Sequence, residues 1–174
     1  MMWTAVALVS ALSLGDQHPA TYAGQERREV KALSAEEIQS YLEGHGTGLA
    51  RTAELNHYPG LKHVLDLAAG LELTESQVAL VRRIYERMHE EAVRLGRAIV
   101  ERERELDRLF AGGGIGAGNL EKVVGEIAGL QGRLRAAHLR AHLETRALLS
   151  PEQVRSYDQL RGYGAHEHPP GRHR

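Results

Sequence analysis

The sequence predicts an all-α fold, an elongated hairpin of two long helices with short flanking helices. Three observations carry this prediction: two long segments with an apolar stripe at helical spacing, a glycine-rich break between them, and an aromatic content of only 5% among 174 residues. Two such stripes can bury each other along one seam. With few large aromatic side chains, a thin helix-on-helix core is favoured over a thick globular one.

The first residues predict a signal peptide, residues 1–23. Trp3 to Leu14 is a run without a charged residue, followed by small and polar residues, as in the hydrophobic core of a secretory signal. The run is too short to span a bilayer, and no Lys or Arg precedes it, so a buried N-terminal helix stays open as the alternative. We expect export, cleavage between Gly15 and Gly24, and a periplasmic location in a Gram-negative envelope.

Residues 24–60 predict an N-terminal extension with short helices. Ser34 followed by Glu37 has the spacing of a capping box at the start of a first helix, and a second short helix fits residues 48–55. Residues 56–60 contain Asn, Pro and Gly and predict a turn. Helices this short need a surface to pack on, and the hairpin is the available one.

Residues 61–163 predict the hairpin domain, with a short helix over 61–70 and a first arm over about 75–110. Glycines between 112 and 118 predict the turn, and Asn119 is expected to cap the second arm. A last short helix and a disordered, His-containing tail over 164–174 are expected after it. The seam of the first arm contains Val81, Tyr85, Met88, Ala92, Leu95, Ile99, Leu106 and Leu109, and that of the second contains Leu120, Val123, Ile127, Leu130, Leu134, Ala137, Ala141 and Leu148.

Two similar sequences stand where helices are expected to begin. The pattern Leu-Thr/Ser-x-x-Gln occurs at Leu73, Thr74 and Gln77, and again at Leu149, Ser150 and Gln153. In each, the hydroxyl and the Gln side chain are spaced to satisfy backbone N–H groups of the first helical turn, and Pro151 suits the first helical position. We interpret all six residues as structural markers of helix starts.

This arrangement resembles the Spy/CpxP family of periplasmic proteins, named for its LTxxQ motif, whose relatives include zinc-resistance-associated proteins and heavy-metal sensors. The resemblance covers about residues 61–163. It implies a four-helix unit that dimerises into a curved shell and holds unfolded or stress-damaged envelope proteins without nucleotide. The function implied is that of an ATP-independent, chaperone-like protein of the envelope stress response, with no required cofactor and with an envelope sensor protein as a further candidate partner.

Residues outside the seam indicate which partners the protein can bind. Leu139 and Leu143 place apolar groups on a second face of the second arm, which predicts a homodimer. The mixed Arg and acidic residues between 82 and 108 predict a solvated face; a client-binding surface with Leu80, Ile84 and Val100 is the alternative. A net charge of −1 gives no basic field for nucleic acid. The chain has no cysteine, no phosphate loop and no nucleophile motif, so we expect no enzymatic activity.

His138 and His142 are four residues apart, which puts both imidazoles on one helix face at a spacing able to bind Zn, Ni, Co or Cu. Glu144, Glu86, Glu90 or His89 could complete such a site, whereas the simpler interpretation is two interfacial histidines. The metal-sensing relatives make a periplasmic heavy-metal sensor or metal-binding protein the alternative function. A chaperone and a sensor would use the same hairpin, so the sequence leaves both open.

Overall fold

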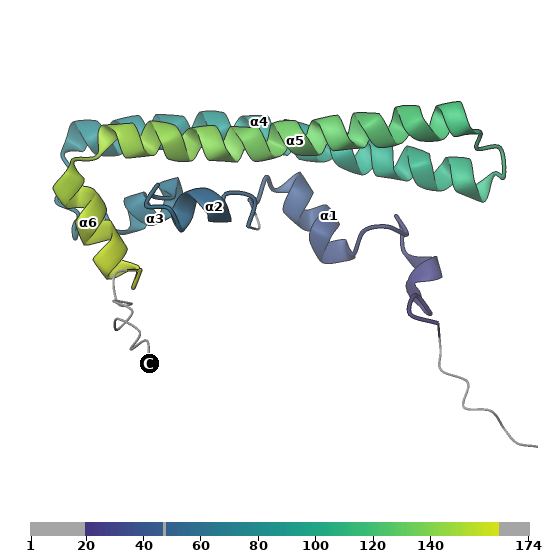
Figure 1. Ribbon diagram of the computed structural model, residues 1–174, viewed down its shortest axis with the longest axis horizontal. Coiled ribbons are helices and arrows are strands. Elements are labelled where there is room, and N and C mark those ends of the chain that lie inside the picture. The colour runs from purple at the N-terminus through teal and green to yellow at the C-terminus, as the bar shows by residue number, and fades with distance from the viewer. Residues whose placement is uncertain (1–19, 47, 164–174) are drawn as a thin grey trace, which may run out of the picture.

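The computed structural model describes residues 20–46 and 48–163, and every regular element in these ranges is helical. Two long helices, α4 (Glu75–Ala111) and α5 (Ala117–Leu148), lie side by side and antiparallel (Figure 1). With 37 residues and a rise of 1.5 Å per residue, α4 is about 55 Å long. The predicted all-α hairpin is therefore confirmed.

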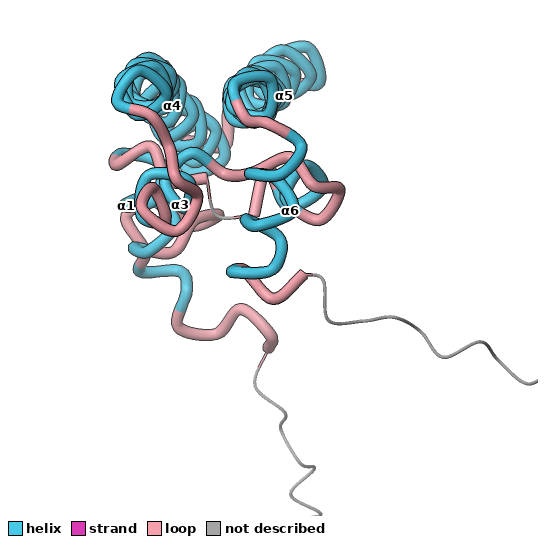
Figure 2. Tube along the Cα trace, turned by 90° about the vertical axis from the view of Figure 1, so that its left-hand side faces the viewer, coloured by secondary structure: helices cyan, strands magenta, loops and turns pink. Residues whose placement is uncertain are grey.

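A second layer of short helices lies against one side of this hairpin. The 3₁₀ helix η1 (Gln25–Arg27) precedes α1 (Ala35–Leu42), α2 (Arg51–Glu54) and α3 (Leu61–Asp66), and α6 (Pro151–Leu160) packs beside them after α5. Viewed end-on, α4 and α5 form one layer and α1, α3 and α6 the other (Figure 2). Lys31, between η1 and α1, forms an ion pair with Asp107 in the last third of α4, with 3.0 Å between Nζ and Oδ2.

The predicted helix starts are confirmed by complete capping boxes. Thr74 Oγ1 accepts from the backbone N–H of Gln77, and Ser150 Oγ accepts from that of Gln153; each Gln side chain returns a bond to the backbone N–H of its cap. Ser34 and Glu37 form the third box, at the start of α1. These bonds satisfy N–H groups that the first turn of a helix leaves without partners.

The core forms three clusters of buried residues along the face where the two layers meet. The largest lies at the base of the hairpin, where Tyr157 of α6 is fully buried among residues of α3, α4 and α5. A middle cluster joins Leu95 and Ile99 to Leu134, and a third places Val30 against Val100. The core is thus one side chain thick, as the low aromatic content predicts.

The helix α1 approaches α4 most closely at Gly96. A Cβ atom at this position would lie 1.9 Å from the carbonyl oxygen of Tyr41. No side chain fits at this distance unless the backbone moves. Gly96 itself is buried in the middle of a helix, where glycine costs about 1 kcal/mol relative to alanine. That cost is offset by the direct backbone contact with α1.

Three sequence-based expectations are corrected. The helix α5 begins at Ala117 with Gly116 as its cap, and not after Asn119, because the turn is completed earlier by Gly113 in a left-handed conformation. Ile84 is buried in the base cluster and Val100 lies beneath Val30 and Leu33. Neither residue is therefore available to a client on the charged face of α4, because the second layer already covers both.

Residues 1–19 of the predicted signal peptide and the predicted tail, residues 164–174, lie outside the described residues. Within the described residues, no helix is both long enough and apolar enough to cross a membrane.

Candidate functional site

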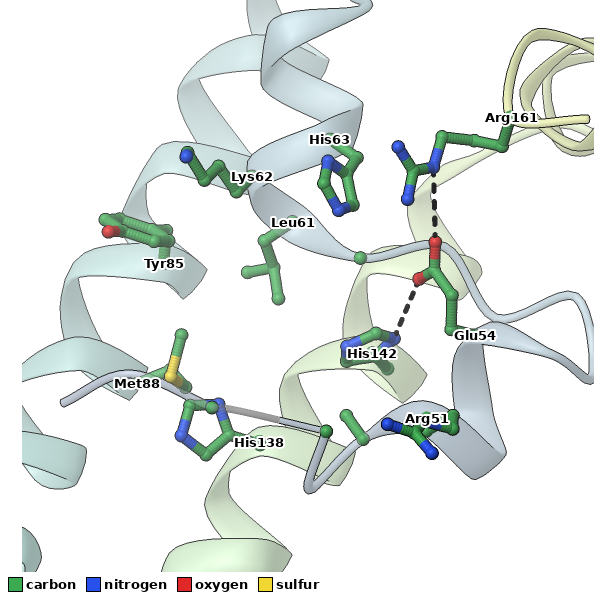
Figure 3. A pocket seen from close by; sticks show the side chains of 14 residues that line it. Arg51, Glu54, Leu61, Lys62, His63, Tyr85, Met88, His138, His142 and Arg161 are labelled. Atoms are coloured by element: carbon green, nitrogen blue, oxygen red, sulfur yellow. Dashed lines mark ion pairs between the residues drawn. The ribbon is translucent and has the colours of Figure 1, made fainter. Parts of the chain in front are cut away.

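A pocket of about 320 Å³ opens between the two layers near the base of the hairpin. Its walls come from the loop before α2, from α2 and α3, from the two long helices and from the residue that follows α6 (Figure 3). His138 and His142 both line it, because residues four apart on α5 project toward the same side. The predicted pair is therefore brought together on one wall of one cavity.

His142 is held in a defined orientation. Its Nδ1 atom lies 2.8 Å from the backbone carbonyl oxygen of Tyr58. A carbonyl oxygen only accepts hydrogen bonds, so Nδ1 carries the proton and donates it. In the neutral ring, Nε2 then keeps its lone pair, and a second hydrogen bond of this kind is what usually orients a metal-binding imidazole.

His138 lies deeper in the same wall and is only 6% exposed. Its Nε2 atom is buried without a hydrogen-bond partner among the described residues, and a Cβ atom on Gly46 would come within 3.0 Å of the ring. Burial lowers the pKa of His138, and the nearby His142 and His89 lower it further because protonated rings repel one another. His138 is thus favoured in its neutral form.

Glu54 of α2 contacts α6 and the residues that follow it. Its Oε1 atom accepts hydrogen bonds from the hydroxyl groups of Tyr157 and Tyr163. Arg161 Nε lies 3.6 Å from Oε1, and His142 Nδ1 lies 3.9 Å from Oε2 (Figure 3). Burial, followed by the hydrogen bond to Glu54, raises the pKa of Tyr157 well above its ordinary value, so this hydroxyl remains a donor.

The acidic residues considered as further metal ligands are placed elsewhere. Glu144 forms an ion pair with Arg87 on the outside of the hairpin, and Glu86 and Glu90 are exposed. His89 stacks on Tyr85, with 5.7 Å between the ring centroids. Across residues 20–46 and 48–163, no group of three or more His, Asp or Glu is arranged to hold a metal ion.

Three polar residues that line the pocket, Glu54, His63 and Arg161, were assigned no function from the sequence. Glu54 is separated from Tyr157 by 103 positions and from Tyr163 by 109, so no local spacing could have linked them. For His63, the sequence indicated only that it lies near a predicted turn. These residues come together only in the tertiary structure, where α2 and α6 pack near α5.

A different surface is left uncovered at the turn end of the hairpin, beyond the second layer. Phe110 is 57% exposed, Leu120 38% and Val124 45%. Leu120 was predicted to belong to the seam, and its burial is incomplete because no element of the second layer reaches it. A separate apolar groove near the C-terminal end of α5 is lined by Tyr58, Leu139 and Leu143, together with residues of α2.

The fold and these surfaces define a helical hairpin protein with a polar pocket between its layers and an incompletely buried seam. A family model described as heavy-metal resistance matches residues 39–156, and the chain belongs to that family, which is part of the Spy/CpxP-like helical group. The family is not known for enzymatic activity. Searches of curated proteins and of solved structures found no match.

Proposed function

We propose that this protein is a periplasmic, ATP-independent chaperone-like protein of heavy-metal resistance, and that it holds unfolded or damaged proteins on the uncovered end of its hairpin. The observation that supports this function is the exposure of Phe110, Leu120 and Val124 on both arms next to the turn. Two helices alone cannot enclose their own apolar seam, and exposed large apolar side chains near one end of a hairpin are candidates for an interaction site.

The charges around this surface suit reversible contact with many sequences. Arg108, Glu121 and Lys122 are exposed next to the apolar side chains, so both signs are present. Mixed charges assist the encounter with polar segments of an unfolded chain, and the small apolar area limits the residence time. Capture of this kind needs no nucleotide.

A holding assay on the distal surface tests the proposal. The purified protein should suppress the light scattering of reduced α-lactalbumin, and the double variant Leu120→Asp with Val124→Asp should lose most of that effect while keeping its helical circular dichroism. Leu160→Asp is the matched control, because Leu160 is 53% exposed but lies on α6. No suppression by the unmodified protein, or an equal loss in the control, would contradict the proposed function.

Metal binding at His138 and His142 is the second candidate function. Two observations on the imidazoles favour it. His142 Nδ1 donates a hydrogen bond to the Tyr58 carbonyl oxygen, which leaves Nε2 for a metal, and His138 Nε2 is buried without a hydrogen-bond partner. Two nitrogen ligands fit Zn, Ni, Co or Cu, with water in the remaining positions. Binding by two fixed protein ligands should be weak and reversible, as a sensor of excess metal requires.

Titration calorimetry with Zn, Ni, Co and Cu tests this second function. Replacing both histidines, His138→Ala with His142→Ala, should abolish the strongest binding, whereas deletion of residues 164–174 should remove only weak binding. Affinity should also fall as the pH drops below about 6.5, where free imidazole is protonated and cannot bind the ion. Submicromolar binding that the double variant loses, in a protein that does not suppress aggregation, would make metal sensing the better assignment.

A further inference from the structure

The pocket between the two layers carries an excess of positive charge. Arg51, Lys62 and Arg161 all line it, against the single carboxylate of Glu54 (Figure 3). The chain as a whole has a net charge of −1, so the excess is local. Positive side chains gathered around one cavity raise the local concentration of anions.

Glu54 offsets only part of this charge. Its Oε1 atom already accepts from two tyrosine hydroxyl groups, and its nearest cation is Arg161, with Nε 3.6 Å away. Arg51 and Lys62 form no ion pair with any residue that the structure describes. Two positively charged side chains of the lining therefore have no negative partner among the described residues.

Two buried nitrogen atoms in the same lining also lack hydrogen-bond partners. They are His138 Nε2 and Arg161 Nε, each buried without a hydrogen bond among the described residues. Arg161 Nε has only the 3.6 Å ion-pair contact with Glu54 Oε1. The guanidinium Nε always carries a proton and can only donate. Buried polar atoms are almost always hydrogen-bonded in folded proteins, so a donor without a hydrogen bond beside a cavity leaves a place for an acceptor.

We propose that this pocket binds a small oxyanion, either free or as the acidic group of a small organic molecule. A volume of about 320 Å³ lies at the lower end of the range typical of small-molecule sites, about 300–1,000 Å³. Leu61, Tyr85 and Met88 form an apolar part of the lining, which suits the organic portion of such a ligand. The guanidinium groups of Arg51 and Arg161 match the planar geometry of carboxylate and phosphate oxygens.

The proposal is independent of the distal apolar surface, and it predicts the opposite charge preference from the metal site considered above. The side chains that attract an anion repel a divalent cation placed at His138 and His142. The two ligand classes can therefore be separated on one protein preparation.

Thermal unfolding of the full chain with inorganic phosphate, phenyl phosphate or chloride, at matched ionic strength, tests the inference. Both phosphates should raise the melting temperature relative to chloride, and phenyl phosphate should act at lower concentration if the organic portion contributes. The double variant Arg51→Ala with Lys62→Ala should need at least ten-fold more ligand for the same shift. The exposed pair Lys122→Ala with Arg133→Ala, which removes the same number of charges from the far part of α5, should respond as the unmodified protein does.

Imidazole proton resonances give a second, local measurement. Phosphate should shift the ring signals of His138 and His142 in the unmodified protein and leave them in place in the Arg51→Ala, Lys62→Ala variant. No stabilisation beyond that by chloride, equal loss of the response in the Lys122→Ala, Arg133→Ala control, or stabilisation by zinc with none by either phosphate would overturn the proposal.

Discussion

Gln77 and Gln153 hydrogen-bond to each other through their side-chain amides, with 2.9 Å from Gln77 Nε2 to Gln153 Oε1 and 3.2 Å for the reciprocal pair. Each oxygen also accepts from the backbone N–H of its own cap residue, Thr74 or Ser150. Each nitrogen also approaches a backbone carbonyl oxygen, that of Leu148 or Leu71. The amide groups thus cap two helices and join their starts at once.

Gln77→Glu should separate these two roles. A carboxylate still accepts from the cap backbone, but it cannot donate to Gln153 or to the Leu148 carbonyl. Leaving part-buried partners unsatisfied costs roughly 1–3 kcal/mol, which urea unfolding followed by circular dichroism would measure. Glu37→Gln, in a capping box without such a partner, should change the unfolding free energy by less than about 0.5 kcal/mol. Equal effects would show that only capping matters.

Gly96→Ala should loosen α1 from the hairpin. The added methyl group would meet the Tyr41 carbonyl oxygen at 1.9 Å, so the backbone must move, at a cost of about 1–3 kcal/mol. Hydrogen exchange should increase over residues 35–42 in particular. The control is Gly125→Ala, where a Cβ atom meets nothing within 4 Å and helix propensity should increase stability by up to about 1 kcal/mol. Unchanged exchange in α1 would contradict the described packing.

Along the hairpin seam, the loss of stability on substitution should increase with the burial of the side chain that is replaced. Leu95 is fully buried, so Leu95→Ala should cost roughly 2–5 kcal/mol, with a smaller loss for Leu130→Ala, whose side chain is half-buried. Gly114→Ala, in the open turn, should cost little. Chemical denaturation would rank the three variants, and equal losses at all three positions would mean that the turn is elsewhere.

Stability should fall with acid partly through His138. Its lowered pKa means that the unfolded chain takes up the proton more readily than the folded one, so stability is lost as the pH falls below about 6.5. His138→Gln cannot titrate and should flatten the dependence of melting temperature on pH between 7 and 5. Met88→Leu disturbs the same pocket lining without removing a titratable group and should keep the original slope. A parallel shift of the whole curve in His138→Gln would point to packing instead.

A homodimer is predicted through the groove at Leu139 and Leu143. Leu143 is 57% exposed and lines this groove together with Tyr58. Burial of each leucine should contribute roughly 1.5–3 kcal/mol. Changing both to Glu should give a folded monomer in analytical ultracentrifugation. The exposed Leu160→Glu on α6 serves as control. A monomeric unmodified protein at micromolar concentration would rule this interface out.

The long elements could be predicted from the sequence because their signals are local. Apolar spacing located both arms, and Ser or Thr followed by Gln or Glu located three helix starts, since capping depends on residues within one turn. The pairing of His138 with His142 was predictable for the same reason. The arrangement of Glu54 and Arg161 was not, because it depends on how two distant short helices pack. The burial of Ile84 and Val100 escaped prediction for that reason too.

The second layer is synthesised largely before the helices on which it packs. Val30 and Leu33 pack on Val100, which follows Val30 by 70 positions, and Gly60 donates to Tyr157, 97 positions later. At roughly 5–20 residues per second, the first segment waits several seconds for the surface that will cover its apolar side chains. Each newly made chain therefore passes through an interval in which the apolar side chains of its N-terminal third are not yet covered. Slower translation of the α4–α6 region should lengthen this interval and reduce the yield of soluble protein.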